Sequence, residues 1–214
     1  MTLTFSMKLL ESNSTIATNM LRALLPDLNK YFNKAVQGIQ KNIPEILIRH
    51  IKAQPEYDSL INGKLKGEFG LADASSKLSS ILSAIESGSV IQVKPLSISN
   101  GKIKGSVTFQ MIKKDFSDLL SIGDGSFSTE KGSQLHWLKW LLTEGDSIII
   151  TDHTFVLGPH PGSRTGLGIM REFGGSSWRV PPEYAGTISN NWITRAIDSA
   201  SQEIDKTLES LTRI

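Results

Sequence analysis

Apolar residues recur at helical spacing from residue 14 to residue 42, the first patterned segment of the chain. They follow one another at intervals of three or four: Ile16, Met20, Leu24, Leu28, Phe32, Val36 and Ile39. Because an α-helix turns about every 3.6 residues, this spacing places them on one face and predicts a long amphipathic helix. Pro26 is expected to kink or divide this helix, since proline lacks the backbone N–H that a helix interior uses.

Shorter helical segments are predicted in the next part of the chain. Pro44 is expected to end the long helix and to begin a short one, because proline suits the first helical position. A second short helix is predicted over residues 55–61. Glycines are expected to interrupt the helical pattern over 63–70, and Asp73 or Ser75 can cap a further helix.

The hydrophobic period changes from helical to alternating after residue 89. Two strand-like runs, 90–99 and 102–113, flank Asn100-Gly101, a strong signal for a two-residue hairpin. Along the second run, one face is apolar: Ile103, Val107, Phe109 and Met111. The other face is polar: Lys102, Lys104, Ser106, Thr108 and Gln110. The hairpin is therefore expected to cover a core with one face only.

The remaining pattern predicts an α+β fold. A short helix (115–122), a polar loop (123–132), an apolar helix (135–142) and two strands (147–151 and 154–157) follow in order. The last helix begins near Asn190 with one apolar face: Ile193, Ile197, Ala200, Ile204, Leu208 and Leu211. The long N-terminal helix and the C-terminal helix are expected to pack on a small antiparallel sheet of about four strands, in a single domain over 1–214. Residues 1–88 form its mainly helical part, and 89–214 hold the hairpin, strands, long loop and C-terminal helix.

A segment rich in glycine and proline separates the last predicted strand from the last helix. Over residues 158–189 it keeps apolar and aromatic side chains, among them Met170, Trp178 and Tyr184, which a disordered linker would lack. Loops of this length are uncommon in compact domains and are usually functional. The segment is therefore predicted to be a long functional loop that docks on another protein.

Composition narrows the classes of function. The net charge of +2 gives no bulk attraction to nucleic acid or to a membrane surface, and no run of about 18 apolar residues predicts a membrane span. The first residues lack the basic and apolar pattern of a signal peptide. The absence of cysteine excludes disulfides and Cys-ligated zinc and fits a reducing cytosol.

Candidate catalytic chemistry is sparse. The glycine-rich segment 162–168 could hold a phosphate through backbone N–H groups, with Arg164 and the nearby His153 and His160. However, it lacks the Lys-Ser/Thr ending of a P-loop, and Ser163 is not in a Gly-x-Ser-x-Gly motif. The histidine spacings match no metal site. A phosphate-handling hydrolase built on this loop stays open as an alternative.

The order of features from Leu135 onward resembles the neck or tail-completion proteins of tailed bacteriophages. An apolar helix with two tryptophans precedes Glu144-Gly145-Asp146 and a strand pair. Pro159-His160-Pro161-Gly162 and Ser163-Arg164-Thr165-Gly166 follow, and Ala185-Gly186-Thr187 then leads into the run Asn191-Trp192-Ile193-Thr194-Arg195-Ala196-Ile197. The similarity covers about the last eighty residues and the overall layout.

The resemblance implies a structural protein of the virion rather than an enzyme, without cofactor, catalytic residue or metal. Such proteins form rings, commonly six-membered, that terminate or complete the tail and join it to the head connector. Expected partners are other copies, connector, tail-tube or sheath proteins, while DNA crosses the ring without specific binding and no membrane is involved. The chain would be made in the bacterial cytoplasm and be located in the neck of the virion. A monomeric adaptor that binds one partner is the other alternative.

Residues of the long loop and the start of the last helix are the predicted protein interface, because arginine and aromatic residues dominate many interfaces. They are Arg164, Thr165, Met170, Arg171, Trp178, Arg179, Tyr184, Trp192 and Arg195.

Overall fold

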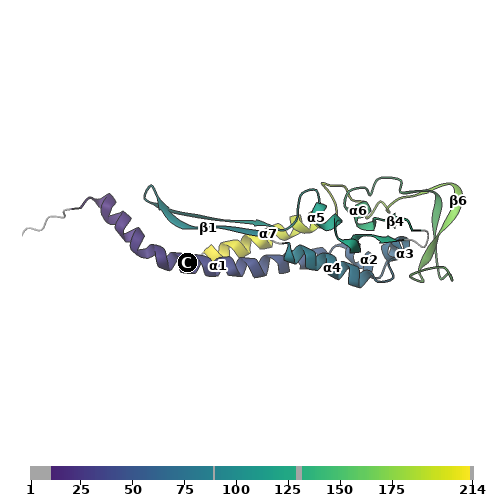
Figure 1. Ribbon diagram of the computed structural model, residues 1–214, viewed down its shortest axis with the longest axis horizontal. Coiled ribbons are helices and arrows are strands. Elements are labelled where there is room, and N and C mark those ends of the chain that lie inside the picture. Colours follow the sequence, from purple (N-terminus) through teal and green to yellow (C-terminus); the bar gives the residue numbers. More distant parts are fainter. Residues whose placement is uncertain (1–10, 89, 129–131, 213–214) are drawn as a thin grey trace, which may run out of the picture.

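The computed structural model of the chain describes residues 11–88, 90–128 and 132–212. They form an elongated molecule with two parts (Figure 1). The stem consists of α1 (Asn13–Lys52), the hairpin β1 (Val90–Ser99) and β2 (Lys102–Gln110), and α7 (Trp192–Thr212). The head consists of the shorter helices α2 to α6 and the strands β3 to β6. The prediction of mixed helices and strands, with a long helix near each end, is confirmed.

The helix α1 is continuous over 40 residues and contains both prolines. Its N-terminal third, which includes Pro26, is bent relative to the rest (Figure 1). The predicted end at Pro44 is wrong. Pro44 and its neighbours Ile43, Ile46 and Leu47 are buried. Burying each such apolar side chain contributes about 1.5–3 kcal/mol, which offsets the roughly 3 kcal/mol that an internal proline costs.

The buried face of α1 differs from the predicted stripe at its N-terminal end. Val36 and Ile39 are buried as expected, but Met20 is 61% exposed and Leu24 is half exposed. The helix begins beyond the part of the stem that α7 covers, so this first section has few neighbours on that face (Figure 1). The periodicity identified the helix correctly, but it did not show how much of the helix is buried by other elements.

The helices α1 and α7 pack antiparallel along the stem. His50 of α1 lies 2.9 Å from the Ser199 hydroxyl and 3.2 Å from a Glu203 carboxylate oxygen, and Arg49 pairs with the same carboxylate. On α7 the buried positions include Ile193, Ala196 and Ala200. Two alanines at the contact allow the helix backbones to approach closely.

One residue of the predicted α7 stripe faces outward. Ile197 is 39% exposed, while Ala196, its neighbour, is fully buried. The predicted apolar face is therefore rotated: it follows 193, 196, 200, 204 and 208 rather than passing through Ile197. Both assignments obey helical spacing, and only the position of α1 selects between them.

The hairpin prediction is confirmed at its turn. Asn100 and Gly101 both have positive φ, 52° and 68°, as a type I′ turn requires. The second strand ends at Gln110 rather than at residue 113. The apolar residues Ile103, Val107 and Phe109 are half-buried, and the polar positions between them are exposed. The Asn29 side chain fixes the hairpin to α1: its Oδ1 accepts from the Leu96 N–H (2.9 Å) and its Nδ2 donates to the Leu96 carbonyl (3.1 Å).

The predicted single sheet of about four strands is wrong, because the strands of the described residues form three separate antiparallel pairs. They are β1–β2, β3 (Phe127–Ser128) with β4 (Gln134–Leu135), and β5 (Ile150–Leu157) with β6 (Gly168–Trp178). The hairpin lies along the stem and β5–β6 lies at the far end of the head, so their edges cannot meet (Figure 1).

The head helices enclose the main core. They are α2 (Pro55–Ile61), α3 (Lys64–Phe69), α4 (Ala74–Ser87), α5 (Ser117–Leu120) and α6 (Trp137–Leu142), with a 3₁₀ turn at Gly123–Gly125. The helix α3 falls in 63–70, where an interruption was predicted, because Leu65 and Phe69 are buried at helical spacing. Phe69 also lies in an aromatic cluster, with ring centroids 6.2 Å from Trp137, 6.0 Å from Trp140 and 5.9 Å from Trp178.

Within the described ranges, no helix has the length and apolar character that crossing a membrane would need. Parts of three predictions lie outside these ranges: the absent signal peptide at residues 1–10, the middle of the polar loop at 129–131, and the last two residues of the C-terminal helix.

Candidate protein interface on the head

The segment predicted as a long loop contains the strand β6, so this prediction is wrong. Residues 168–178 pair with β5, and only 158–167 and the stretch before α7 are irregular. The two strands predicted at 147–151 and 154–157 are likewise one strand, β5. Glycine pairs such as Gly174-Gly175 suggest a loop, but here they form a local irregularity inside a strand.

That irregularity shapes the surface of the β5–β6 pair. The register passes from His153 opposite Glu172 to Thr151 opposite Ser177, so several residues of β6 bulge outward. Asp152, at φ 55°, accepts the Gly175 N–H at 3.0 Å and stabilises the bulge. As a result the Phe173 side chain is 66% exposed.

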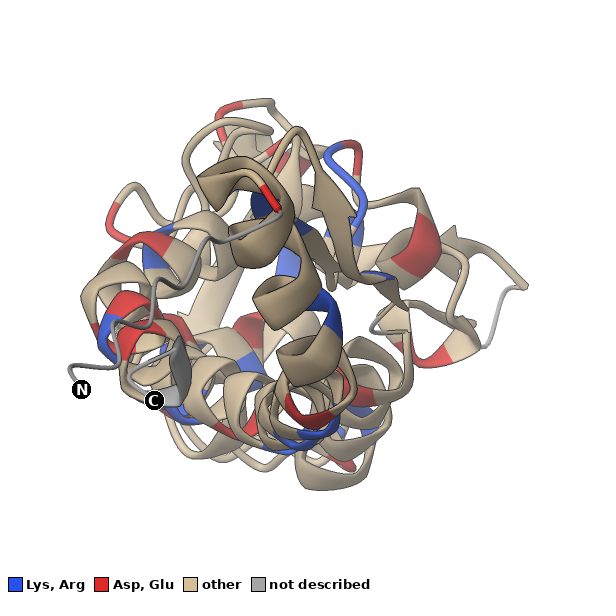
Figure 2. Cartoon of the chain, turned by 90° about the vertical axis from the view of Figure 1, so that its left-hand side faces the viewer, with Lys and Arg blue, Asp and Glu red and all other residues tan. Residues whose placement is uncertain are grey.

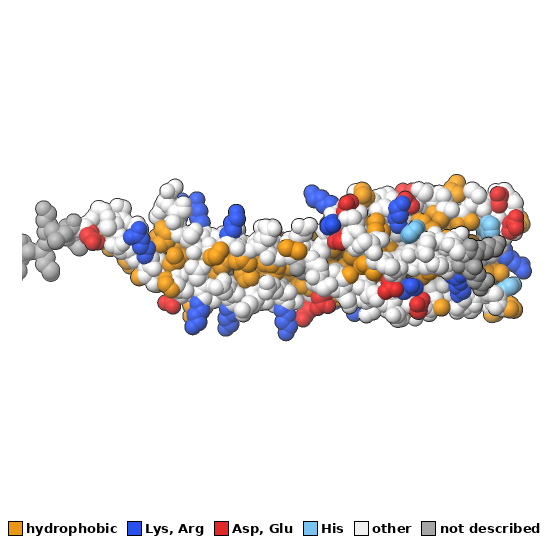
Figure 3. Space-filling view, in the orientation of Figure 1, with side chains coloured by type: hydrophobic (Ala, Val, Ile, Leu, Met, Phe, Trp, Pro, Cys, Tyr) orange, Lys and Arg blue, Asp and Glu red, His pale blue; other side chains and the backbone are white. Residues whose placement is uncertain are grey.

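More large apolar side chains are exposed near this bulge and around the head. Leu157, at the end of β5, is 76% exposed. The others with more than about a third of their surface exposed are Ile148, Val156 and Ile188. We call Ile148, Val156, Leu157, Phe173 and Ile188 the exposed apolar set of the head. The space-filling view shows apolar side chains scattered among charged ones at the head end of the molecule (Figure 3).

Hydrogen bonds within the connection 158–167 occupy its hydroxyl groups. The Ser163 hydroxyl donates to the Gly168 carbonyl (2.7 Å) and accepts from the Gly168 N–H (3.3 Å). The Thr165 hydroxyl accepts from the Leu167 N–H at 3.2 Å. His160 accepts from a backbone N–H of the same turn, and His153 lies against the Thr151 carbonyl. Ser163 therefore stabilises a turn, and none of these bonds joins it to a general base.

Arg164 lies beside a shallow hollow of about 230 Å³. Its guanidinium carbon is 4.9 Å from the centroid of the Phe127 ring, a cation–π contact. Trp140 and Trp178, whose ring centroids are 6.0 Å apart, line the same hollow. The Arg164 side chain is exposed, so it is available to a partner from outside the chain.

Glu68 lies between this hollow and a second one of about 560 Å³. Burial raises the pKa of the Glu68 carboxyl to about 7, against the opposing effects of Lys64 and a hydrogen bond from Trp178, while Glu183 raises it further. The Glu68 Oε2 atom is buried and has no hydrogen-bond partner among the described residues. The charge of Glu68 therefore changes near neutral pH, and no sequence signal singled this residue out.

Several predicted interface residues belong to the interior. Trp178 and Trp192 are buried in the main core, with 7% and 1% of their surface exposed. Met170 and Tyr184 are half-buried against that core. Arg195 pairs with the buried Glu56 of α2. These five side chains stabilise the subunit itself.

The other predicted interface residues lie at the surface. Arg164, Arg171 and Arg179 are exposed, and Thr165 is half-buried in its turn. Arg171 lies opposite Thr154 in the β5–β6 pair. Their part in an interface stays a prediction. Sequence reasoning missed the exposed apolar set, although Phe173 stands directly before Gly174-Gly175, a place where a strand often bulges.

In the part of the chain that the structure describes, no three side chains of His, Cys, Asp or Glu are grouped so that they could hold a metal ion. The comparisons with known proteins return no match: no family model, no curated protein and no solved structure is similar to this chain.

Proposed function

We propose that the chain is a structural subunit of a bacteriophage neck, which forms a ring that completes or terminates the tail and joins it to the head connector. The observation that supports this most is the exposed apolar set of the head. These five large apolar side chains are exposed to water in the single subunit, and a partner that covers them would remove this apolar surface from water.

The exposed arginines complement this apolar set. Arg164, Arg171 and Arg179 lie on the same strand pair or beside it, and arginine is enriched where protein interfaces are tightest. A head-to-tail contact between copies would place the set of one subunit against a different surface of the next, and a rotation that closes generates a ring. The elongated shape gives each subunit a second end for a neighbouring ring (Figure 1).

The chemistry of the head favours this role over the hydrolase. Ser163 holds a turn through Gly168, and Arg164 stacks on Phe127. The near-neutral chain also suits a channel through which DNA slides, because many phosphate contacts would retain the DNA.

Paired variants test the proposed surface. Leu157→Ser combined with Phe173→Ser should leave the thermal melt of the isolated subunit within about 0.5 kcal/mol of wild type, since both residues are exposed. Ring formation, measured by native mass spectrometry and electron microscopy, and particle assembly should both fall at least tenfold. The matched control is Val90→Ser, an exposed apolar residue at the start of the stem hairpin, which should assemble like wild type.

Two results would contradict the proposal. Wild-type ring formation by the double variant would show that the exposed apolar set is not the contact. A single 23.5 kDa copy bound to one partner in purified virions would instead favour the monomeric adaptor.

A further inference from the structure

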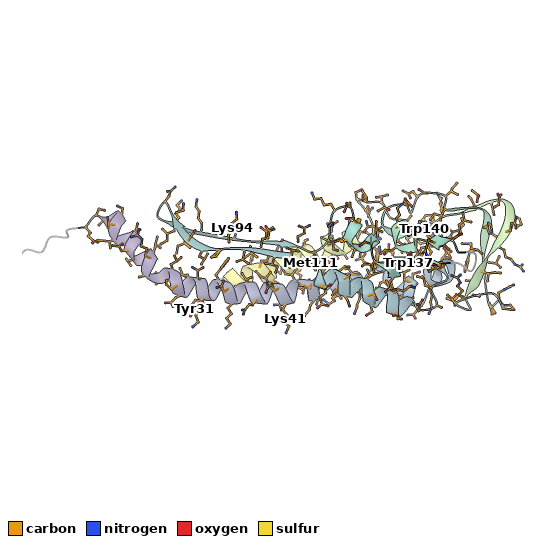
Figure 4. All side chains as sticks on the ribbon, in the orientation of Figure 1. Tyr31, Lys41, Lys94, Met111, Trp137 and Trp140 are labelled. Atoms are coloured by element: carbon orange, nitrogen blue, oxygen red, sulfur yellow. The ribbon has the colours of Figure 1, made fainter. Side chains whose placement is uncertain are left out.

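The outer face of the β1–β2 hairpin, on the side away from α1, is polar and exposed. Lys94 projects from this face (Figure 4). The cross-strand pairs along it consist entirely of exposed side chains: Gln92 with Thr108, Lys94 with Ser106, Ser97 with Lys104, and Ser99 with Lys102.

A lysine faces a serine in three successive pairs of this outer face. We call Lys94, Ser97, Ser99, Lys102, Lys104 and Ser106 the lysine–serine face. Because an antiparallel strand rises about 3.4 Å per residue, the three pairs follow one another over about 14 Å. Each pair offers an ammonium group and a hydroxyl group, and both groups can donate hydrogen bonds to an anionic oxygen.

A bulge in β1 brings Lys94 onto this face. Residues three apart in a regular strand point to opposite sides, but the register shifts between Lys94 and Ser97, so both lie on the outer face. Leu96, inside the bulge, exchanges two hydrogen bonds with the Asn29 side chain of α1 (2.9 and 3.1 Å). The lysine–serine face is therefore fixed to the helix behind it at its middle.

The positive charge of the hairpin is not balanced locally. Residues 90–110 contain three lysines and neither Asp nor Glu, whereas acids slightly outnumber basic residues over the rest of the chain. None of the three lysines is in an ion pair with another residue of the described ranges. Viewed along the long axis, basic and acidic segments are mixed around the molecule (Figure 2), so the surplus belongs to the hairpin rather than to one whole side.

We propose that the lysine–serine face binds the phosphate backbone of duplex DNA without reading its sequence. Lysine and serine side chains are typical donors to DNA phosphates. The 14 Å of this face match about four phosphates of one strand, which follow one another every 3.4 Å along the helix axis.

The side chains of this face favour duplex DNA over other anionic partners. They include no aromatic ring on which the bases of a single strand could stack. They also include no large apolar side chain that could enter a membrane or form the apolar centre of a protein interface.

Three lysines make a weak contact that depends strongly on salt. Such a contact agrees with the low net charge of the chain, and it would allow DNA to move past the protein. The inference concerns a surface of the single chain, on the stem rather than on the head, and does not rest on the proposed function.

DNA binding by the full-length chain tests this face. A fluorescein-labelled 20-base-pair duplex of mixed sequence is titrated with the protein, and binding is followed by fluorescence anisotropy. With three lysine–phosphate contacts, the logarithm of the association constant should fall against the logarithm of salt with a slope of about −2.7. Binding should therefore weaken about fortyfold between 50 and 200 mM salt, and equally for a duplex of another sequence.

Variants of the chain locate the binding. Lys94→Gln, Lys102→Gln and Lys104→Gln should each reduce the size of this slope by about 0.9, and the triple variant should abolish binding. The matched control replaces three lysines on the outward face of α1 by glutamine: Lys30, Lys34 and Lys41. Lys41 lies on the other side of the stem from Lys94 (Figure 4), so this control should keep the wild-type slope. All six lysines are exposed, so circular dichroism and thermal melts should stay unchanged.

Four results would overturn the inference. Absence of binding at 1 mM protein and 50 mM salt would remove the site. An equal loss in the α1 control would show a general effect of charge rather than a site on the hairpin. Tighter binding of a 20-base single strand would contradict the preference for a duplex. Binding of a 20-residue polyglutamate peptide as tightly as the duplex, with the same dependence on Lys94 and Lys104, would identify an acidic protein as the partner.

Discussion

Glu68 shows how one side chain can make the head sensitive to pH. Its carboxylate is partly removed from water between two hollows, and the Trp178 indole and Lys64 compensate only in part for the lost hydration. The folded state therefore binds a proton at this carboxyl more tightly than an unfolded chain does, in which a glutamate has a pKa near 4.3.

The sign of the resulting stability change follows from linkage. Between the ordinary glutamate pKa and about 7, the folded state holds more protons at Glu68 than the unfolded state, so stability falls as pH rises. Glu68→Gln should remove this contribution. The melting temperature of wild type relative to Glu68→Gln should decrease from pH 5 to pH 8 in scanning calorimetry.

The neighbouring acid Glu183 raises the pKa of Glu68 but does not itself change charge in this pH range. The pKa of Glu183 is lowered by a bond to its own backbone and by Lys64, so its contribution is lost only as pH falls below the ordinary glutamate range. Asp115→Asn, at a carboxyl whose pKa is lowered by hydrogen bonds from Ser117, is the control and should leave the dependence between pH 5 and pH 8 unchanged. A pH dependence that is the same in wild type and Glu68→Gln would contradict the assignment.

Asn191 joins α7 to the head through four hydrogen bonds. Its Oδ1 accepts from the N–H groups of Ile193 and Thr194, which caps α7, and its Nδ2 donates to the carbonyls of Leu142 and Thr187. The side chain is fully buried. All of its hydrogen-bonding groups are therefore used within the protein.

Asn191→Ala should destabilise the fold by about 2–4 kcal/mol in urea titrations, since it removes a cap and leaves a buried carbonyl unsatisfied. Asn191→Asp keeps the acceptor oxygen but not the amide donor. It should therefore retain the stabilisation from capping α7 and lose the stabilisation from the bonds to Leu142 and Thr187. Asn190→Ala is the control: this side chain is exposed and accepts from Arg195, so its loss should cost less than about 1 kcal/mol. Equal losses at both positions would refute the assignment.

At the scale of elements, the sequence predicted the helices well and the partners of the strands poorly. The spacing of Val36 and Ile39, or of Ala196 and Ala200, follows from helix geometry alone. Which of two adjacent stripes on α7 is buried depends on the position of α1, which lies about 150 residues away in the sequence. Similarly, alternation identifies β1–β2 and β5, but the contact between Asn29 and Leu96 decides that the hairpin lies on α1.

The sequence allowed the exposed arginines of the candidate interface to be predicted, but not which of its apolar and aromatic side chains are exposed. Arginines in the segment 158–189 are indeed exposed. Tryptophans there are buried, because residues 168–178 form a strand whose last side chain, Trp178, packs on Phe69 and Trp140. Exposure of Leu157 and Phe173 depends on a bulge opposite Asp152, and no local pattern specifies which side of a two-stranded pair remains uncovered.

Two neighbouring isoleucines of α7 offer a direct test of the rotated face. Ile193 is fully buried and Ile197 is 39% exposed. Ile193→Ala should therefore cost about 2–5 kcal/mol of unfolding free energy, and Ile197→Ala less than about 1 kcal/mol. Because both changes delete the same atoms from the same helix, each is the other's control. A larger loss at Ile197 would restore the stripe predicted from the sequence.

At the scale of the whole molecule, the head and stem are joined by an ion pair. Glu56, in the first turn of α2, is fully buried and pairs with Arg195 of α7, whose side chain is 36% exposed. The second carboxylate oxygen of Glu56 is buried without a hydrogen-bond partner among the described residues. Removing one partner of this pair is therefore expected to destabilise the protein by more than the intact pair stabilises it.

Arg195→Ala should destabilise the protein by about 3–5 kcal/mol, because it leaves a buried carboxylate unpaired. Adding Glu56→Gln to this variant should restore part of the loss, as measured by chemical denaturation. Lys64→Ala, which breaks the exposed pair with Glu183, is the control and should cost about 0–1 kcal/mol. The prediction fails if the two single variants are equally stable.

The order of elements in the stem has a consequence for synthesis of the protein. The helix α1 is completed at Lys52, but α7, which covers it, begins only at Trp192. At about 5–20 residues per second, the ribosome needs on the order of ten seconds to reach α7. During that time the apolar residues of α1 that α7 will bury lack their final partner, so a nascent chain that stalls before α7 is a substrate for chaperones and proteases.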